Sequence, residues 1–157
     1  MTLSYRGRTG EVTALAHTTL KVEKGEFAAV VGPSGCGKST LMKLVTGLIR
    51  PTKGKVEVDG ADVTGPVKIA GMAFQAANML PWRSVIDNVM LPLEIVQPHR
   101  GRLSRERAAY RERAMDLLGV VGLRDFADRY PWEMSGGMQQ RASLCRALIH
   151  EPALLML

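Results

Sequence analysis

The sequence predicts an α/β fold, and three observations carry this prediction. The apolar run Phe27–Val31 is typical of a buried strand, and Leu41–Val45 has the pattern of a helix. A glycine-rich loop joins these two runs. Further along, residues 84–131 have helical patterns and interrupt a chain that otherwise consists of strand-like runs. At 157 residues, we expect a single domain, 1–157, with a helical subdomain, 84–131, inserted in it.

The N-terminal third is predicted to contain short strands and turns around one helix. The strand-like runs are Met1–Tyr5, Val12–Val22, Phe27–Val31 and Lys55–Val58. Asp59-Gly60, which follows the last of these, is a strong signal for a two-residue hairpin turn. The helix after the glycine-rich loop should end near Gly47, because glycine suits the left-handed conformation found just beyond many helices.

The rest of the chain is predicted to alternate between strands and helices. The expected elements are a strand over Ile69–Phe74, a helix from Ser84 through Leu91, a helix over Arg105–Leu118, a short helix over Leu123–Asp128, a helix over Met138–Ile149 and a strand over Ala153–Leu157. Ser84 and Ser104 can cap the first two helices, and Gly119 would end the second.

The glycine-rich loop matches the phosphate-binding pattern G-x-x-x-x-G-K-[ST] at every fixed position. Its residues are Gly32, Pro33, Ser34, Gly35, Cys36, Gly37, Lys38, Ser39 and Thr40. The glycines allow turns that point successive backbone N–H groups inward, and the helix start adds its own N–H groups and positive dipole. Lys38 can reach the β- and γ-phosphates of a nucleotide, and the Ser39 hydroxyl can bind Mg²⁺. The alternative, an ordinary turn, does not explain the strand before the loop and the helix after it.

Composition and charge set limits on the class of protein. Hydrophobic residues make up 46% and charged residues 23%, which is ordinary for a globular protein, and no apolar run is long enough to span a bilayer. No signal peptide is visible at the polar N-terminus, and the two cysteines lack metal or disulfide spacing, so we expect a reducing cytosol. The net charge of +6 could indicate nucleic acid or an anionic membrane. Because Glu106 and Glu112 dilute the arginines of 100–113 and no aromatic ladder accompanies them, a solvated face is favoured.

Further motifs give the chain a family resemblance. Phe74-Gln75, the run 134–141 (Met-Ser-Gly-Gly-Met-Gln-Gln-Arg) and the final apolar strand occur in that order after the phosphate-binding loop. Together they resemble the nucleotide-binding subunit of an ATP-binding cassette (ABC) transporter, and Leu80-Pro81-Trp82 resembles the nitrate/sulfonate/taurine importer branch. Met134 and Met138 stand where leucine and glutamine are commonest in the family.

The resemblance implies a P-loop, RecA-like core with an N-terminal antiparallel β-subdomain and the inserted helical subdomain. It also implies roles for individual residues. Lys38 and Gln75 would be catalytic, Gln75 would bind Mg²⁺ together with Ser39, and Tyr5 would stack on adenine. A signature motif would bind the ATP held by the opposite subunit, and its residues would be Ser135, Gly136, Gly137, Met138 and Gln139. Taken alone, Gln75 could be an ordinary polar residue at a strand end, and Tyr5 a packing residue.

ATP and Mg²⁺ are the cofactors that the resemblance implies. The protein would be a peripheral subunit on the cytoplasmic side of the cell (inner) membrane, with a second ATP-binding cassette and transmembrane permease subunits as partners. Phe74–Trp82 and the helices after Ser84 would form the docking surface for the permease. A periplasmic or extracellular solute-binding protein would be an indirect partner, and no nucleic acid is expected. The function would be ATP hydrolysis that energises import of a small solute, which this chain itself does not select.

Alternatives to this function remain at the level of the sequence. In the family, a strand like Ala153–Leu157 runs into an Asp-Glu pair, and a histidine follows later; His17, His99 and His150 do not match it. The sequence is therefore expected to be incomplete at its C-terminus and to lack family-like ATP turnover. A nucleotide-binding module without turnover, a soluble non-transport cassette ATPase and a P-loop kinase are the alternatives.

Overall fold

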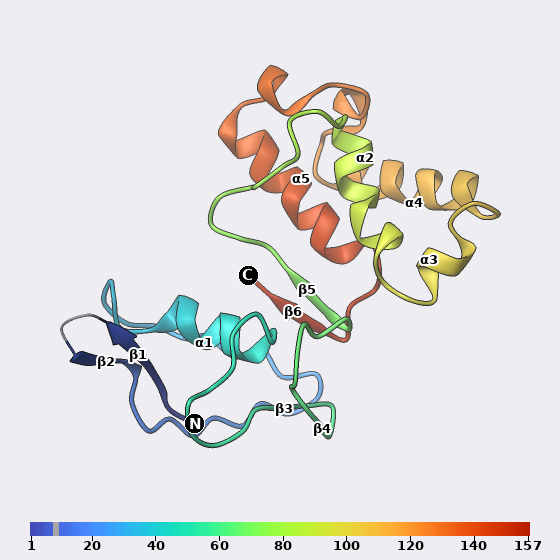
Figure 1. The fold of residues 1–157 in the computed structure, drawn as a ribbon. Helices are drawn as coiled ribbons and strands as arrows, with labels where there is room; N and C mark the ends of the chain where they lie inside the picture. The colour runs from blue at the N-terminus through green and yellow to red at the C-terminus, as the bar shows by residue number, and fades with distance from the viewer. Residues whose placement is uncertain (8–9) are drawn as a thin grey trace. The chain divides into compact units, whose positions relative to one another are not determined.

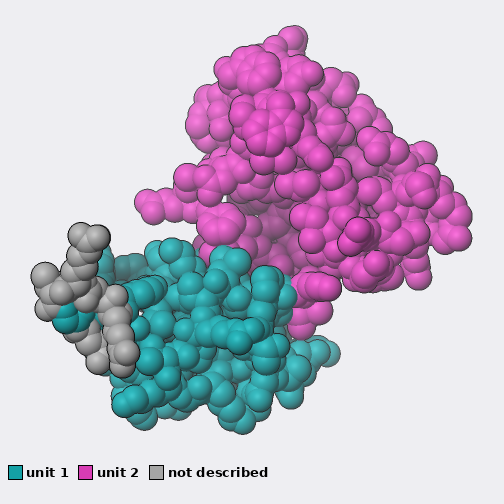
Figure 2. All heavy atoms as spheres, in the orientation of Figure 1, with its two compact units in different colours: residues 1–67 teal, residues 68–157 magenta. Residues whose placement is uncertain are grey.

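The computed structural model describes residues 1–7 and 10–157, and the chain divides into two compact units. Unit 1 is Met1–Val67 and unit 2 is Lys68–Leu157 (Figure 2). Each unit is described by itself. The single domain 1–157 and the subdomain 84–131 stay predictions.

Unit 1 contains two antiparallel strand pairs (Figure 1). Strand β1 (Leu3–Gly7) pairs with β2 (Gly10–Leu15), and β3 (Glu57–Val58) pairs with β4 (Ala61–Asp62). The turn between β3 and β4 has φ of 52° at Asp59 and 74° at Gly60. Positive φ at both central residues characterises the hairpin turn that matches strand twist. The hairpin predicted from Asp59-Gly60 is therefore confirmed.

Helix α1 (Lys38–Val45) packs against the small core of unit 1. Leu44 is fully buried and clusters with Leu3 of β1 and with Val56. The chain leaves the helix through Gly47, whose φ of 72° lies in the left-handed region. A Cβ at this position would lie 1.9 Å from the carbonyl oxygen of Gly65, so only glycine fits. The helix end predicted near Gly47 is confirmed.

The strand predicted over Phe27–Val31 is wrong. None of the three sheets in the described part of the chain includes these residues, and the side chains of Phe27 and Val31 are about nine-tenths exposed (89% and 90%). A β-strand exists through hydrogen bonds to a neighbouring strand, and the apolar pattern alone does not supply that neighbour. For the same reason, the strand predicted over Val12–Val22 is only partly right, because β2 ends at Leu15.

Unit 2 is built around four α-helices and three short 3₁₀ helices. They are α2 (Val85–Met90), η1 (Leu91–Glu94), α3 (His99–Arg102), α4 (Arg107–Val120), η2 (Arg124–Phe126), η3 (Pro131–Glu133) and α5 (Gly136–Leu148). Helix α5 packs on both α2 and α4. Apolar side chains from all three helices, including Val89, Leu118 and Cys145, form the main core of the chain.

A parallel strand pair stands beside α5. Strand β5 (Ala70–Met72) pairs with β6 (Leu154–Met156), so the helices of unit 2 form the connection between two parallel strands (Figure 1). Gly71 is buried where β5 meets the last turn of α5. A Cβ there would lie 2.2 Å from the carbonyl oxygen of Ala147, which explains why this strand position is a glycine.

The predicted helix boundaries were partly right. Ser84 caps α2, because its Oγ accepts a hydrogen bond from the Asp87 backbone N–H. Ser104 does not cap α4, which begins after Glu106, and Gly119 does not end it, since the helix continues to Val120. A helical glycine costs only about 1 kcal/mol relative to alanine, and burial of the adjacent Leu118 can outweigh that cost. Helix α5 begins at Gly136, two residues earlier than predicted.

The arginine-rich run lies in and around α3 and α4. Four of its arginines pair with carboxylates, in the ion pairs Arg105–Glu106, Arg107–Asp87, Arg111–Asp128 and Arg113–Glu151. Exposed pairs of this kind contribute at most about 1 kcal/mol each. In the part of the chain that the structure describes, no helix combines the length and the apolar character that crossing a membrane requires.

Candidate functional site

The glycine-rich loop of unit 1 adopts a conformation that depends on its glycines. Gly35 and Gly37 have φ of 81° and 100°, in the region where L side chains are strained. A Cβ at Gly32 would lie 2.8 Å from the Cys36 Sγ, so the loop closes tightly on itself. The backbone N–H of Cys36 donates to the Pro33 carbonyl at 3.4 Å and completes this turn. The loop is therefore a compact ring of backbone that leads directly into α1.

Lys38 folds back over this ring. Its Nζ donates to the carbonyl oxygens of Gly32 and Pro33, both at 2.8 Å, and lies 3.6 Å from the Cys36 Sγ. These two carbonyls hold the ammonium group against the loop. Because an ammonium has three donors, an anion of higher charge can replace one of these carbonyls without unfolding the loop.

The N-terminus of α1 offers further donors to an anion. Gly37 is the N-cap, no side chain caps the helix, and no acidic residue lies in its first turn. The unpaired N–H groups and the positive end of the helix dipole therefore face the loop without a competing carboxylate. Ser39 is exposed and Thr40 half-buried in this first turn. The loop, Lys38 and the helix start together have the donors that a phosphate group would need, and cation binding by the exposed Ser39 stays a prediction.

Tyr5 lies on β1, also in unit 1. It pairs with Val12 of β2, and both side chains are exposed, Tyr5 by 51%. An exposed ring on a strand can offer one face to a planar ligand. Its assignment to adenine stays a prediction.

Gln75 lies in unit 2, at a bend just after β5. Its side chain is exposed, and the segment 74–80 has no regular secondary structure. Two side chains of α5 hold this segment by its backbone. The Gln140 Nε2 donates to the Phe74 carbonyl at 3.1 Å, and Arg146 donates to the carbonyls of Ala77 at 2.5 Å and Asn78 at 3.0 Å.

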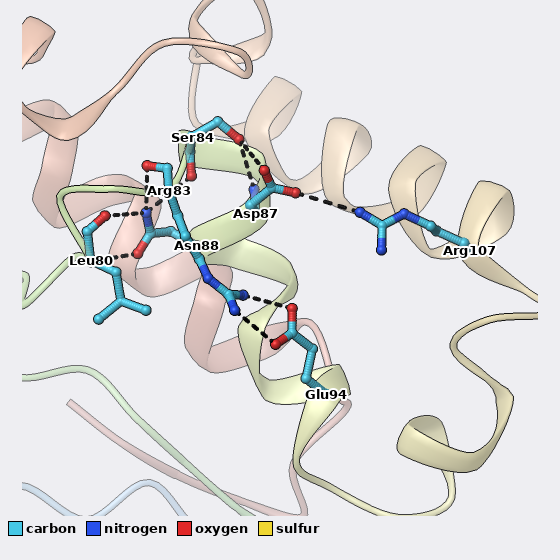
Figure 3. A network of polar contacts seen from close by, with 7 residues as sticks. All are labelled: Leu80, Arg83, Ser84, Asp87, Asn88, Glu94 and Arg107. Carbon is cyan, nitrogen blue, oxygen red and sulfur yellow. Dashed lines mark hydrogen bonds and ion pairs between the residues drawn. The ribbon is translucent and has the colours of Figure 1, made fainter.

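Asn88 of α2 holds the far end of the same segment (Figure 3). Its side-chain amide is fully buried and exchanges two hydrogen bonds with the backbone of Leu80, and its NH₂ group also donates to the carbonyls of Arg83 and Ser84. Beside it, Arg83 forms a bidentate ion pair with Glu94, in which Nη1 and Nη2 donate to the two carboxylate oxygens at 2.6 and 3.0 Å. The hydrogen bond to that carboxylate raises the pKa of Arg83.

The signature residues form the start of α5. Ser135 is the N-cap, and its Oγ accepts from the Met138 N–H at 3.3 Å. Gly136 and Gly137 are exposed in the first turn. Met138 packs against the core, and the Gln139 Nε2 donates to the carbonyls of Pro131 and Met134. The glycines are thus open to a ligand, whereas Met138 and Gln139 stabilise the turn that precedes the helix.

The structure therefore places the predicted residues in two groups. The phosphate-binding loop and Tyr5 belong to unit 1, whereas Gln75 and the signature residues belong to unit 2. Sequence reasoning missed Gln140, Arg146 and Asn88, which hold the segment around Gln75. Asn88 could have been identified from the sequence, because an amide side chain on the apolar side of a helix needs hydrogen-bond partners. Among the described residues, no group of three or more His, Cys, Asp or Glu side chains is arranged to hold a metal ion.

Comparison with known proteins gives a consistent result. A family model described as "ABC transporter" matches residues 15–157. The chain is 42% identical over 153 residues to the nitrate import ATP-binding protein NrtD of Synechocystis sp., covering 98% of this chain and 55% of that protein. It is 41% identical over 149 residues to the taurine import ATP-binding protein TauB of Jannaschia sp., covering 94% of this chain and 53% of that protein. The chain thus spans about half the length of these relatives.

The fold has counterparts among solved structures. A dimeric ATP-binding cassette in a post-hydrolysis state, bound to ADP and Pi, superposes with a TM-score of 0.83 at 32% identity, covering 98% of this chain and 69% of that one. The α/β cassette fold predicted from the sequence is therefore confirmed.

Proposed function

We propose, because this chain belongs to the ABC transporter family, that it is part of an ATP-binding subunit that energises the import of a small solute. The observation that carries the proposal is the loop of unit 1, where Lys38 is held above a ring of backbone at an uncapped helix start. Relatives named as nitrate and taurine import ATP-binding proteins support the direction of transport and the solute class.

The proposed chemistry is phosphoryl transfer from ATP to water. Such a reaction depends on positioning and on neutralising charge on the transferred group, with little covalent work by the protein. Lys38 and the loop N–H groups would hold the β- and γ-phosphates, and Tyr5 would stack on the base. Mg²⁺, when bound, would offset phosphate charge, and Ser39 and Gln75 would be its protein ligands. Gln75 would thereby respond to the presence of the γ-phosphate.

The proposed partners follow from the family. The exposed glycines 136 and 137 would bind the ATP of a second cassette, with Ser135, Met138 and Gln139 shaping their turn; a dimeric solved relative supports this. Permease subunits would dock on the segment Phe74–Trp82 and the helices after it, at the cytoplasmic side of the membrane. Trp82, 69% exposed, suits that role, whereas Met79 is buried and serves the core. A solute-binding protein would act through the permease.

Nucleotide binding is tested by thermal unfolding with Mg²⁺ and ATP or ADP. Ligand at 100 times its Kd should stabilise the folded chain by about 2.7 kcal/mol. Lys38→Ala should remove most of this shift. Lys43→Ala is the matched control, since Lys43 lies exposed on the same helix, away from the loop, and should keep the full shift. An equal shift in Lys38→Ala and wild type would refute nucleotide binding by this loop.

A further inference from the structure

The segment around Gln75, residues 74–80, has no regular secondary structure. Side chains of α5 bind its backbone instead. Gln140 contacts the carbonyl of Phe74, immediately before Gln75, and Arg146 contacts the carbonyls of Ala77 and Asn78, shortly after it. The two anchors therefore bracket Gln75 while its own side chain stays exposed. These two contacts restrict the backbone of Gln75 and leave its side-chain amide exposed.

The spacing of the anchors fits this arrangement. Six residues separate Gln140 from Arg146 along α5, a rise of about 9 Å. The carbonyls they hold are three to four residues apart, which spans roughly 10–13 Å of extended chain. The chain between the two anchors bends at Gln75 and Ala76, so it is shorter than this extended length and can match the separation of the two side chains along α5.

Burying the guanidinium group of Arg146 costs free energy unless its N–H groups find hydrogen-bond partners. Burial lowers the pKa of its guanidinium, and within the described residues no carboxylate forms an ion pair with it. Its partners are two backbone carbonyls and, at 3.4 Å, the Ser143 hydroxyl. A fork-shaped donor can hold two neighbouring carbonyls at once, which a lysine or a neutral amide of that length does less well.

We propose that Gln140 and Arg146 are positioning residues that fix the backbone on both sides of Gln75 and thereby set how Gln75 responds to a γ-phosphate. Both belong to α5, the helix that begins at Ser135, so the same rigid element carries the signature residues at its N-terminus and the anchors of Gln75 along its side. This inference rests on the proposed function for its second half, the response to nucleotide.

The first test is amide hydrogen exchange of residues 74–80 in the nucleotide-free chain. Arg146→Met and Gln140→Leu should each raise the exchange rate of this segment by roughly tenfold, since local opening then loses one or two hydrogen bonds. Arg141→Met is the control: Arg141 lies on the same helix and donates to a backbone carbonyl, but to that of Val121. If Arg146→Met does not fold, Arg146→Lys is measured instead, with a smaller rise expected. Unchanged exchange in 74–80, or an equal rise in Arg141→Met, would overturn the inference.

The second test separates positioning from general destabilisation. The readout is the ratio of affinities for a non-hydrolysable ATP analogue and ADP, both with Mg²⁺. Gln75→Ala should lower this ratio by roughly tenfold, the value of one hydrogen bond to a charged group. Arg146→Met should lower it similarly while leaving ADP affinity unchanged, and the double variant should be no worse than either single one. Additive losses would overturn the inference. If wild type binds neither nucleotide, the proposed function fails, and the exchange test alone decides whether Gln140 and Arg146 position the segment.

Discussion

The side-chain amide of Asn88 and the backbone of Leu80 form a reciprocal pair of hydrogen bonds. The Leu80 N–H donates to Asn88 Oδ1 at 2.7 Å, and Asn88 Nδ2 donates to the Leu80 carbonyl at 3.0 Å. This is the pattern that two paired strand residues make, with one backbone replaced by a side chain. The same NH₂ group also binds the carbonyls of Arg83 and Ser84 (Figure 3). One buried amide thus satisfies the backbone of the chain where it enters α2.

Asn88→Leu should destabilise unit 2 strongly. The substitution fills a similar volume but leaves the Leu80 N–H and the Arg83 carbonyl without their partner, at about 1–3 kcal/mol for each buried group left unsatisfied. The carbonyls of Leu80 and Ser84 keep the backbone N–H groups of Arg83 and Asn88. We expect a loss of about 2–4 kcal/mol in the free energy of unfolding, measured by urea denaturation. Glu112→Ala, an exposed change on α4, should remain within about 0.5 kcal/mol of wild type. A loss below about 1 kcal/mol for Asn88→Leu would contradict the importance of this amide.

Ser84→Ala and Ser104→Ala should differ although both serines were predicted caps. Ser84 caps α2 and also donates to the Asp87 carboxylate at 2.8 Å, so its removal should cost about 1 kcal/mol. Ser104 is exposed and precedes the actual N-cap of α4, Glu106, so its removal should cost at most about 0.5 kcal/mol. Urea denaturation of the two variants side by side decides the matter. Equal costs would mean that α4 begins at Ser104 in solution.

Protonation of His150 should destabilise the chain as the pH falls below neutral. His150 is 7% exposed, and within residues 1–7 and 10–157 neither of its ring nitrogens has a hydrogen-bond partner. Burial lowers the pKa of His150 below 6.5; the nearby Ala70 backbone opposes this shift, and the charges of His99 and Arg113 add to it. Arg113 is itself paired with Glu151.

The folded state therefore holds neutral His150 at a pH where the unfolded chain already binds a proton. Stability from this group is complete above pH 6.5 and decreases as the pH falls toward the lower pKa of the folded state. The urea midpoint should drop between pH 7 and pH 5.5, and His150→Gln should reduce that drop. An identical pH dependence in the variant would assign the effect to other groups.

The two thiols should react at very different rates with an alkylating reagent at pH 8. Cys36 is exposed in the phosphate-binding loop, whereas Cys145 is buried in the core and desolvation raises its pKa to about 11. Because the thiolate is the nucleophile, Cys145 should stay unmodified in the folded chain. Mass spectrometry after peptide digestion should find modified Cys36 first. Comparable early modification of both would show that unit 2 opens readily.

The elements predicted correctly are those whose signals are local. A hairpin at Asp59-Gly60, the end of α1 at Gly47 and the cap at Ser84 each depend on a few adjacent residues, and sequence carries that information. Phe27–Val31 failed because an apolar run specifies burial, whereas a strand also needs a neighbour that the run does not encode. The end of α4 failed for a related reason, since packing around Leu118 outweighed the local signal of Gly119.

The candidate site also contains parts with local sequence signals and parts that depend on residues far apart in the chain. The compact conformation of the glycine-rich loop and the helix that follows it depend on contiguous residues and could be predicted from the sequence, whereas phosphate binding by this loop stays a prediction. The anchors of the Gln75 segment could not, because Gln140 and Arg146 lie more than 60 residues away in sequence from the carbonyls they bind. Their side chains look like ordinary helix-surface residues until the fold brings the segment beside α5.

Within the segment, Arg146 and Gln140 bind only main-chain oxygens, and this has a consequence for which side chains the segment can carry. Every residue type presents the same carbonyl, so the grip does not depend on which side chains occupy 76–78. Ala76 is exposed and can be exchanged most freely, whereas Ala77 packs against the core and Asn78 has a positive φ of 45° that favours asparagine. Under the proposed permease docking, the exposed side chains of this segment would change with the partner while the hydrogen bonds to α5 stay the same.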